Sequence, residues 1–279
     1  MDQYKSLVAM ISEMDGVVVG YSGGVDSTLV AKAAADALGE RAVCVLIDSF
    51  LIPKSEIDDA VMIATELGFN LVRLKMDVLE VNNLAENEPD RCYFCKKAVF
   101  SKLLEVAKEH GLECVLDGTN TDDESDFRPG AKAVEELGIR SPLKELGITK
   151  DQVREMSREL GLPTWDKPSY ACLASRVPYG TPLTLEILGQ VEAAESILHE
   201  LGFRECRVRH HGDIARIELM PEDMRAMLAT EPRNLVLHRF RALGYGYVTM
   251  DLAGYRTGSM NEPLLGNNNN FKEWGVGNR

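Results

Sequence analysis

The chain has 279 residues, 45% of them hydrophobic, which is enough to fill the core of one large domain or two moderate ones. Its 31 Lys and Arg against 44 Asp and Glu give a net charge of -13, which disfavours broad binding to nucleic-acid phosphates and favours a small substrate. We expect a cytoplasmic protein without disulfides or membrane spans, because the sequence shows neither a signal peptide nor a long apolar stretch and has only six cysteines.

Apolar runs alternate with stretches of helical periodicity through the first half of the chain. The predicted strands cover residues 16–21, 42–48, 70–76 and 113–119, and the predicted helices cover 28–38, 56–67 and 97–110. This alternation predicts an α/β fold with a doubly wound, mostly parallel sheet. The ligand site of such a sheet lies at the carboxyl ends of its strands.

The pattern changes after about Tyr179. We predict a helix near 184–201, a hairpin of strands 206–211 and 214–219 around Gly212-Asp213, a helix from Pro221 to about Leu243, and a strand at 246–252. The sequence therefore predicts two domains, a nucleotide-binding domain at 1–178 and a smaller α+β domain at 179–279.

The motif Ser22-Gly23-Gly24-Val25-Asp26-Ser27 stands between the first predicted strand and the following helix. Its glycines let the backbone approach a phosphate, its two serines offer hydroxyl donors, and the next helix presents unpaired N–H groups. Asp26 is interpreted as a magnesium ligand or as an organiser of the loop. The alternative is an ordinary strand-to-helix turn with an aspartate cap.

This loop resembles the PP-loop of the N-type ATP pyrophosphatases, which split ATP into AMP and pyrophosphate while they adenylate an oxygen atom. It lacks the GxxxxGK pattern of a Walker A loop. The resemblance implies that two strand ends contact the nucleotide, at Asp48-Ser49 and at Asp117-Gly118-Thr119-Asn120. Each of these residues also suits an ordinary polar loop.

Three cysteines have spacings that suit metal or sulfur chemistry. Cys92 and Cys95 form a CxxC pair, and Cys172 follows about eighty residues later. Three thiolates suit a 4Fe-4S cluster with one open iron, and a catalytic thiol beside a CxxC pair and a structural role are the alternatives. Cys44, Cys114 and Cys206 are read as packing residues.

Six segments together resemble the LarE family of ATP-dependent sulfur transferases: SGGVDS, DRCYFCK, DGTNTDDESDFRPG (117–130), SPL (141–143), CLASR (172–176) and GYRTGSMN (254–261). The resemblance covers most of the chain. It implies that ATP activates the carboxylates of pyridinium-3,5-biscarboxylic acid mononucleotide, which become thiocarboxylates of the precursor of the nickel-pincer cofactor. It also implies a homo-oligomer, a hexamer in the family, whose second domain binds substrate or other subunits.

The family implies two exclusive sources of sulfur. In some members a single cysteine, at the position of Cys172, gives up its own sulfur and becomes dehydroalanine. Members with three cysteines carry a 4Fe-4S cluster that delivers an additional sulfide. The trio Cys92, Cys95 and Cys172 follows the second pattern, so we expect the cluster route, with the physiological sulfur donor undetermined.

Charged side chains complete the predicted site. Magnesium and cations stabilise the charge that moves onto pyrophosphate, and the candidates in or beside the motifs are Lys96, Arg128, Lys167 and Arg176. Arg176, Asp26 and Cys172 are the predicted catalytic residues. Each cation also suits a solvated surface position.

The predicted hairpin carries a second charged group. Arg207 and Arg209 alternate on one strand and so share a face, which suits a phosphate, and the family resemblance places the substrate's phosphate there. Glu195 and Glu218 are candidates for a divalent cation, although carboxylates exposed to solvent are common.

Three other classes of protein remain as alternatives. A tRNA thiolase also combines a PP-loop with three cysteines, but the acidic pI of about 4.9 and the lack of a basic, aromatic-rich stretch argue against it. An amide-forming ligase of the NAD or GMP synthetase type has no need of the cysteine trio. A nucleotide sensor that holds ATP without turnover has no need of the full motif set.

Overall fold

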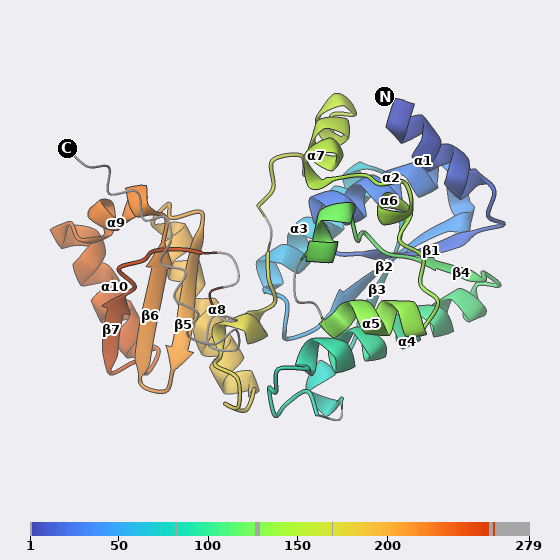
Figure 1. Cartoon of the computed structure of the whole chain (residues 1–279). Coiled ribbons are helices and arrows are strands. Elements are labelled where there is room, and N and C mark those ends of the chain that lie inside the picture. Colours follow the sequence, from blue (N-terminus) through green and yellow to red (C-terminus); the bar gives the residue numbers. More distant parts are fainter. Residues whose placement is uncertain (1, 82, 126–128, 169, 257–258, 260–279) are drawn as a thin grey trace. The chain divides into compact units, whose positions relative to one another are not determined.

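The computed structural model describes residues 2–81, 83–125, 129–168, 170–256 and 259, and the chain divides into two compact units (Figure 1). The first unit contains Met1–Ala174 and Tyr179–Gly189, and the second contains Ser175–Pro178 and Gln190–Arg279. We predicted one boundary after Pro178. The chain instead passes between the units three times, after Ala174, after Pro178 and after Gly189.

The first unit is built on a four-stranded sheet. Its strands, in the order β3-β2-β1-β4, are all parallel, and they are β1 (Val17–Tyr21), β2 (Ala42–Asp48), β3 (Asn70–Lys75) and β4 (Cys114–Leu116). The prediction of a mostly parallel sheet is confirmed. Because every strand runs in the same direction, the loops that follow β1, β2 and β4 leave the sheet at one edge.

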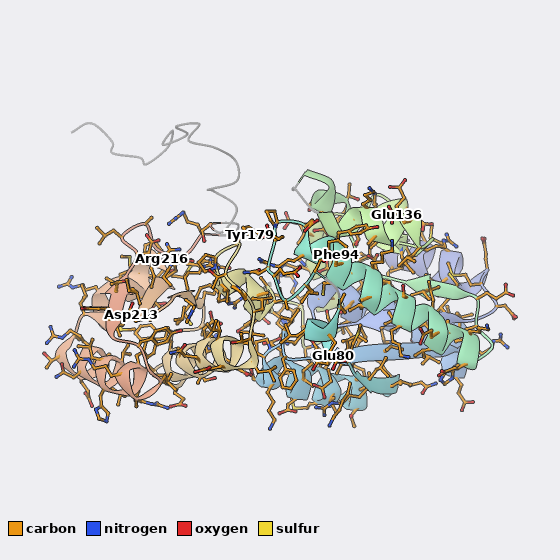
Figure 2. All side chains as sticks on the ribbon, turned by 90° about the horizontal axis from the view of Figure 1, so that it is seen from below. Glu80, Phe94, Glu136, Tyr179, Asp213 and Arg216 are labelled. Carbon is orange, nitrogen blue, oxygen red and sulfur yellow. The ribbon has the colours of Figure 1, made fainter. Side chains whose placement is uncertain are left out.

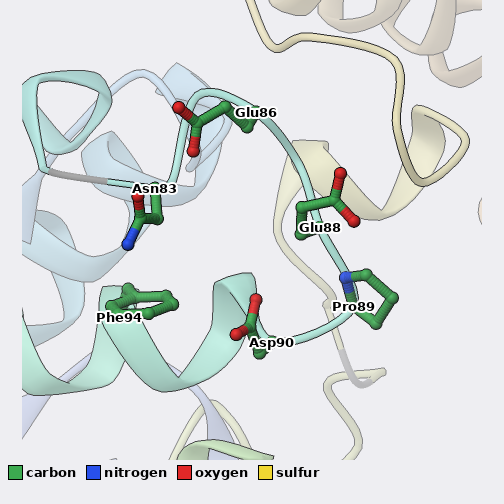
Figure 3. Close-up of a pocket in the computed structure, with 6 residues that line it drawn as sticks. All are labelled: Asn83, Glu86, Glu88, Pro89, Asp90 and Phe94. Carbon is green, nitrogen blue, oxygen red and sulfur yellow. The ribbon is translucent and has the colours of Figure 1, made fainter.

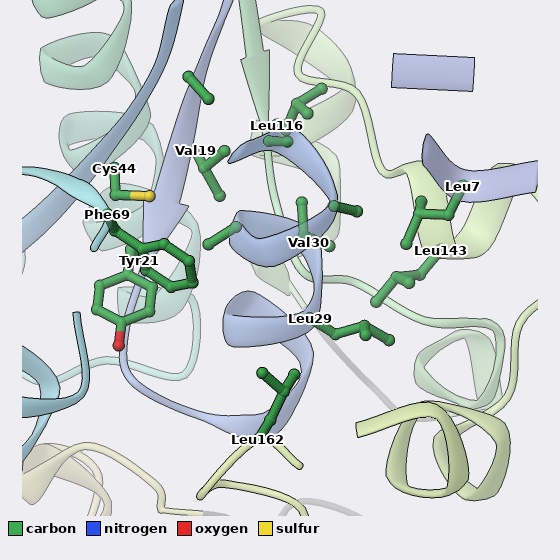
Figure 4. Packing of buried hydrophobic residues seen from close by; sticks show 14 of the residues in the cluster. Leu7, Val19, Tyr21, Leu29, Val30, Cys44, Phe69, Leu116, Leu143 and Leu162 are labelled. Carbon is green, nitrogen blue, oxygen red and sulfur yellow. The ribbon is translucent and has the colours of Figure 1, made fainter. Parts of the chain in front are cut away.

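Helices cover both faces of this sheet, as Figure 1 shows. Val17 and Val19 of β1 belong to a core with α2, and Figure 4 shows Val19 beside Val30 of that helix. Val18 belongs to a separate core with α4, as period-2 alternation requires. The doubly wound prediction is therefore confirmed. The helices of this unit are α1 (Asp2–Ser12), α2 (Val25–Leu38), α3 (Lys54–Glu66), α4 (Arg91–Glu109), α5 (Pro129–Glu136), α6 (Pro142–Glu145) and α7 (Lys150–Glu159).

The second unit contains a mixed sheet in the order β5-β6-β7. The predicted hairpin of β5 (Cys206–His211) and β6 (Ile214–Leu219) is confirmed, and β7 (Tyr247–Met250) pairs in parallel with β6. Helix α8 (Leu185–Glu200) begins in the first unit and ends in the second. Among the described helices, none is long and apolar enough to cross a membrane.

The prediction of one helix from Pro221 to Leu243 is wrong. The structure has two helices there, α9 (Pro221–Met227) and α10 (Thr230–Ala242). Pro232 explains the break, because it has no N–H to donate to the carbonyl of Leu228 and its ring would clash with that carbonyl in a continuous helix. In the first turn of α10 the same proline causes no such loss.

Candidate active site

The glycine-rich loop joins β1 to α2 and is held by its own serines. The Ser22 and Ser27 hydroxyls lie 3.0 Å apart, and the Ser22 N–H donates to Ser27 Oγ over 3.2 Å. Gly23 has a φ of 70°, and a Cβ there would lie 2.6 Å from Cβ of Ala60 on α3. Only glycine fits this position, so the loop keeps its backbone open to an anion.

Asp26 connects this loop to two later segments of the first unit. Its carboxylate accepts a hydrogen bond from Asn120 Nδ2 over 3.1 Å and forms an ion pair with Lys150 at the start of α7. Gly118 packs against the same turn, since a Cβ there would lie 2.9 Å from the Ser27 nitrogen. The predicted nucleotide-binding residues of β1 and β4 are thus adjacent in space.

The polar residues that follow β2 and β4 already have partners within the first unit. Asp48 pairs with Arg73 of β3 over 2.9 Å, and the buried Asp117 accepts hydrogen bonds from the backbone and hydroxyl of Thr119 and from Ser141. These contacts fix the strand ends. Ser49 is buried at the end of β2, where we predicted contact with adenine.

The three predicted cysteine ligands all belong to the first unit. Helix α4 begins at Arg91, six residues earlier than predicted, so Cys92 and Cys95 lie in its first two turns. The segment of Cys172 is held by a hydrogen bond from the Leu173 nitrogen to the Leu51 carbonyl, 2.8 Å long, beside the loop that follows β2. Cys172 is also close enough to affect the charge of both thiols of the CxxC pair.

Burial dominates the protonation of these thiols. It raises the pKa of Cys95 to about 12 and also raises that of Cys92, and the negative charge of Cys172 acts in the same direction. The thiols of Cys92 and Cys95 are therefore protonated unless a cation or metal joins them. Within the described part of the chain, no group of three or more His, Cys, Asp or Glu side chains is arranged to hold a single metal ion.

The remaining cysteines behave as packing residues. Cys44 and Cys206 are buried, and burial raises the pKa of each to about 12, while Cys114 is half-buried on β4. These thiols are poor nucleophiles.

The cations predicted to meet pyrophosphate have different surroundings. Lys96 is exposed on α4, with its ammonium 5.0 Å from the ring centroid of Phe100. Lys167 lies 2.9 Å from a carboxylate oxygen of Glu56 on α3 and 3.9 Å from one of Asp59. Arg128 lies outside the described residues.

Charged residues form a buried cluster in the second unit. Arg176 is fully buried and donates two hydrogen bonds of 2.9 Å to Glu195, and Arg209 donates one of 2.7 Å to Glu218. Arg207 lies over the ring of Tyr255. We predicted Arg176 for pyrophosphate and the two glutamates for a divalent cation; here the charges are paired within the second unit.

A pocket of about 510 Å³ lies at the start of α4, the helix that carries the CxxC pair (Figure 3). It is lined by residues of the loop before α4 and of its first turns: Asn83, Glu86, Glu88, Pro89, Asp90 and Phe94. Its three carboxylates repel an anion such as ATP. The phosphates of ATP therefore fit the glycine-rich loop better than this pocket.

Sequence reasoning missed two cations of the first unit. Lys150 contacts Asp26 although the two are 124 positions apart, and Arg91 is buried beside the first cysteine. The only sequence signals were the position of Lys150 after Thr149, which caps α7, and that of Arg91 directly before the CxxC pair.

Comparison with known proteins agrees with this arrangement. The sequence profile of the NAD synthase family matches residues 3–167, which include the glycine-rich loop and the CxxC pair and end before Cys172. The GMP synthase of Pectobacterium atrosepticum is 31% identical over 64% of this chain and 36% of its own length. These matches identify a PP-loop domain that uses ATP.

Other relatives match nearly the whole chain. The pyridinium-3,5-bisthiocarboxylic acid mononucleotide synthase of Lactiplantibacillus plantarum is 43% identical over 93% of this chain and 94% of its own length. An uncharacterised protein of Synechocystis is 42% identical over 93% of this chain and 97% of its own. The chain therefore belongs to the LarE family of ATP-dependent sulfur transferases, whose catalytic domain is a PP-loop domain of the NAD synthase type.

Proposed function

We propose that this enzyme adenylates the carboxylates of pyridinium-3,5-biscarboxylic acid mononucleotide with ATP and converts them into thiocarboxylates for the nickel-pincer cofactor. The printed name of the Lactiplantibacillus relative supports the substrate. The observation that carries the proposal is the presence, in one compact unit, of a PP-loop and of three cysteines within electrostatic reach of one another.

The first unit supplies the parts for carboxylate activation. A carboxylate is a poor electrophile, and adenylation turns its oxygen into a good leaving group. The backbone N–H groups of the Ser22–Ser27 loop and the start of α2 bind the phosphates of ATP. Asp26 binds magnesium together with ATP, and Lys150, released from Asp26, stabilises the charge on pyrophosphate.

The three cysteines are chemically the donor set that an iron–sulfur cluster needs, although they are not arranged around one metal ion in this structure. Cys92, Cys95 and Cys172 are three thiols within electrostatic reach of one another, all partly buried. When bound, a 4Fe-4S cluster held by three thiolates keeps one iron open for an additional sulfide. The chain's own part is to hold the three sulfurs and to place the segment of Cys172 beside the loop after β2.

The second unit suits the phosphate of the mononucleotide. Among its described residues, three arginines are buried (Arg176, Arg207 and Arg209) against two buried glutamates (Glu195 and Glu218). Arg209 Nε is buried without a hydrogen-bond partner among the described residues. A buried donor without a partner and an excess of positive charge favour an anionic ligand at Arg207 and Arg209.

Other parts of the proposal rest on the family alone. A divalent cation at Glu195 and Glu218 has to displace Arg176 and Arg209 from them. Lys96 and Arg128 are proposed as substrate contacts. We also propose a cytoplasmic homo-oligomer that receives sulfide from a separate donor.

The test is pyrophosphate release and product mass with anaerobically purified protein, ATP, Mg²⁺, the dicarboxylate mononucleotide and sulfide. We expect release only when substrate is present, and a thiocarboxylate product. Formation of an amide with ammonia in place of sulfide would instead show a ligase of the NAD or GMP synthetase class.

The same reaction distinguishes the two sulfur sources. The cluster route predicts several turnovers, an unchanged mass at Cys172, and loss of activity in Cys92→Ala. Conversion of Cys172 to dehydroalanine in proportion to product, with full activity in Cys92→Ala and Cys95→Ala, would contradict the cluster route and leave the ATP chemistry intact.

A further inference from the structure

Arg91 is a buried cation at the start of the CxxC helix. It is only 4% exposed, although it is a charged side chain and the first residue of α4. Arginine is rarely buried unless a partner compensates its charge. The residues around Arg91 therefore indicate which group compensates its charge.

The contacts of Arg91 fix its position. Its NH1 group donates a 2.5 Å hydrogen bond to the side-chain oxygen of Asn87, and its guanidinium lies 4.5 Å from the ring centroid of Tyr179, which is labelled in Figure 2. Asn87 in turn donates to the Thr181 carbonyl over 3.0 Å and accepts from the Gly180 nitrogen. The loop before α4 is thus tied to the segment 179–181, and the guanidinium is held between them.

The groups that contact Arg91 are uncharged, and they do not satisfy all of its hydrogen-bond donors. Among the described residues, none places a carboxylate in an ion pair with Arg91, and its Nε–H is buried without a hydrogen-bond partner. Neither the amide of Asn87 nor the face of Tyr179 cancels a full positive charge. Among the described residues, the charge of Arg91 is therefore not compensated by a carboxylate.

The groups beside Arg91 that can carry negative charge are the thiols. Cys92 is the next residue of α4, and Cys95 stands four residues after Arg91, on the same face of this helix. Three thiolates brought together, with or without iron, are the anionic group that this cation fits.

We propose that Arg91 is a positioning residue for the sulfur centre: its clamped guanidinium supplies a positive charge and an Nε–H donor to the anionic sulfurs of Cys92, Cys95 and Cys172. This inference rests on the proposed function, because it assigns these cysteines to sulfur transfer. It adds a side chain that is neither a ligand nor a contact of ATP.

The proposal is tested by the local potential at Cys92 in the metal-free, reduced full-length chain. Iodoacetate is an anion and iodoacetamide is neutral, and both react with the thiolate, so the ratio of their rates is independent of how much thiolate is present. We expect this ratio at Cys92, followed by peptide mass spectrometry, to fall about fivefold in Arg91→Gln, the effect of one unit charge at close range in water-like surroundings.

Two further variants separate charge from structure. Arg91→Lys keeps the charge and should keep most of the ratio, whereas Lys102→Met removes an exposed cation of the same helix and should leave the ratio unchanged. An unchanged ratio in Arg91→Gln overturns the proposal. If that variant does not fold, the ratio at Cys92 of the wild type is compared with the ratio for an uncharged cysteine peptide. The chain has a net charge of -13, which repels iodoacetate, so only a nearby cation can raise the wild-type ratio above the peptide value. A wild-type ratio at or below the peptide value therefore also overturns the proposal.

This measurement needs no ATP, substrate or iron, so its failure is distinct from that of the proposed function. If the wild-type protein binds no iron and the iodoacetate-to-iodoacetamide ratio still falls in Arg91→Gln, the role of Arg91 is supported and the cluster route is contradicted. In cluster-loaded protein we expect a lower reduction potential in Arg91→Gln than in the wild type, because the reduced cluster carries more negative charge. Equal potentials in loaded wild type and Arg91→Gln would count against the proposal.

Discussion

In the proposed function, the two units of this enzyme prepare a site for an anion by opposite means. In the first unit the glycine-rich loop relies on backbone and small side chains, with Gly23 packed against Ala60 and the serine hydroxyls bonded to each other. In the second unit, Arg207 and Arg209 are buried side chains on one strand, held by Tyr255 and Glu218.

This difference corresponds to the fate of the two ligands that we propose for these sites. Pyrophosphate must leave after each adenylation, and backbone N–H groups with a movable lysine bind it without a large fixed charge. A substrate phosphate takes no part in the reaction and serves as a handle, so permanently buried arginines suit it. The comparison predicts that backbone changes damage the first unit and that loss of charge damages the second.

Gly23→Ala should have the largest effect. The new Cβ meets Ala60 at 2.6 Å and the residue has a φ of 70°, so strain and overpacking together cost about 2–5 kcal/mol of unfolding free energy. Urea denaturation measures this loss, and pyrophosphate release should disappear. Gly68→Ala is the matched control, because Gly68 also has a positive φ, of 68°, but nothing within 4 Å of a Cβ. Equal losses in both variants would show that packing against Ala60 does not constrain the loop.

Arg207→Ala should weaken binding of the phosphorylated substrate by about 1.5–3 kcal/mol, the scale of a charged hydrogen bond. Calorimetry with the mononucleotide and with its dephosphorylated nucleoside measures the effect, which should be absent for the nucleoside. Arg239→Ala removes an exposed arginine that pairs with Glu200 and serves as control. If wild-type protein binds nucleotide and nucleoside equally well, the phosphate is held elsewhere.

Local sequence patterns predicted the regular elements of both units well. The bounds of β2, β5 and β6 agree with the predicted strands because alternation and the Gly212-Asp213 turn are local signals. The break before α10 was missed because the apolar period runs through Pro232. The geometry of the site depends on long-range contacts, such as that of Asp26 with Lys150, which no local pattern encodes.

Lys150→Met tests that long-range contact. It removes the cation that stabilises pyrophosphate, and we expect the KM for ATP to rise about tenfold, equivalent to about 1.4 kcal/mol. The requirement for Mg²⁺ should fall, because no lysine then competes with the metal for Asp26. Steady-state pyrophosphate release at several Mg²⁺ concentrations measures both changes. Lys132→Met, at an exposed lysine of α5 paired with Glu136, should change neither. An unaltered KM in Lys150→Met would mean that the ion pair only stabilises the free protein.

The smallest expected effect is a pH dependence of stability that arises from the second unit. Burial lowers the pKa of His210, which lies on β5 with its ring beside Tyr245. Between its lowered pKa in the folded protein and its ordinary pKa of about 6.5, the unfolded chain binds a proton that the folded chain does not. The unfolding free energy should therefore decrease as the pH falls below about 6.5, and His210→Asn should reduce this slope in urea titrations, whereas His238→Asn, at an exposed position of α10, should not. A slope that His210→Asn leaves unchanged would assign the pH dependence to other groups, of which His211, whose pKa is also lowered by burial, is the next to substitute.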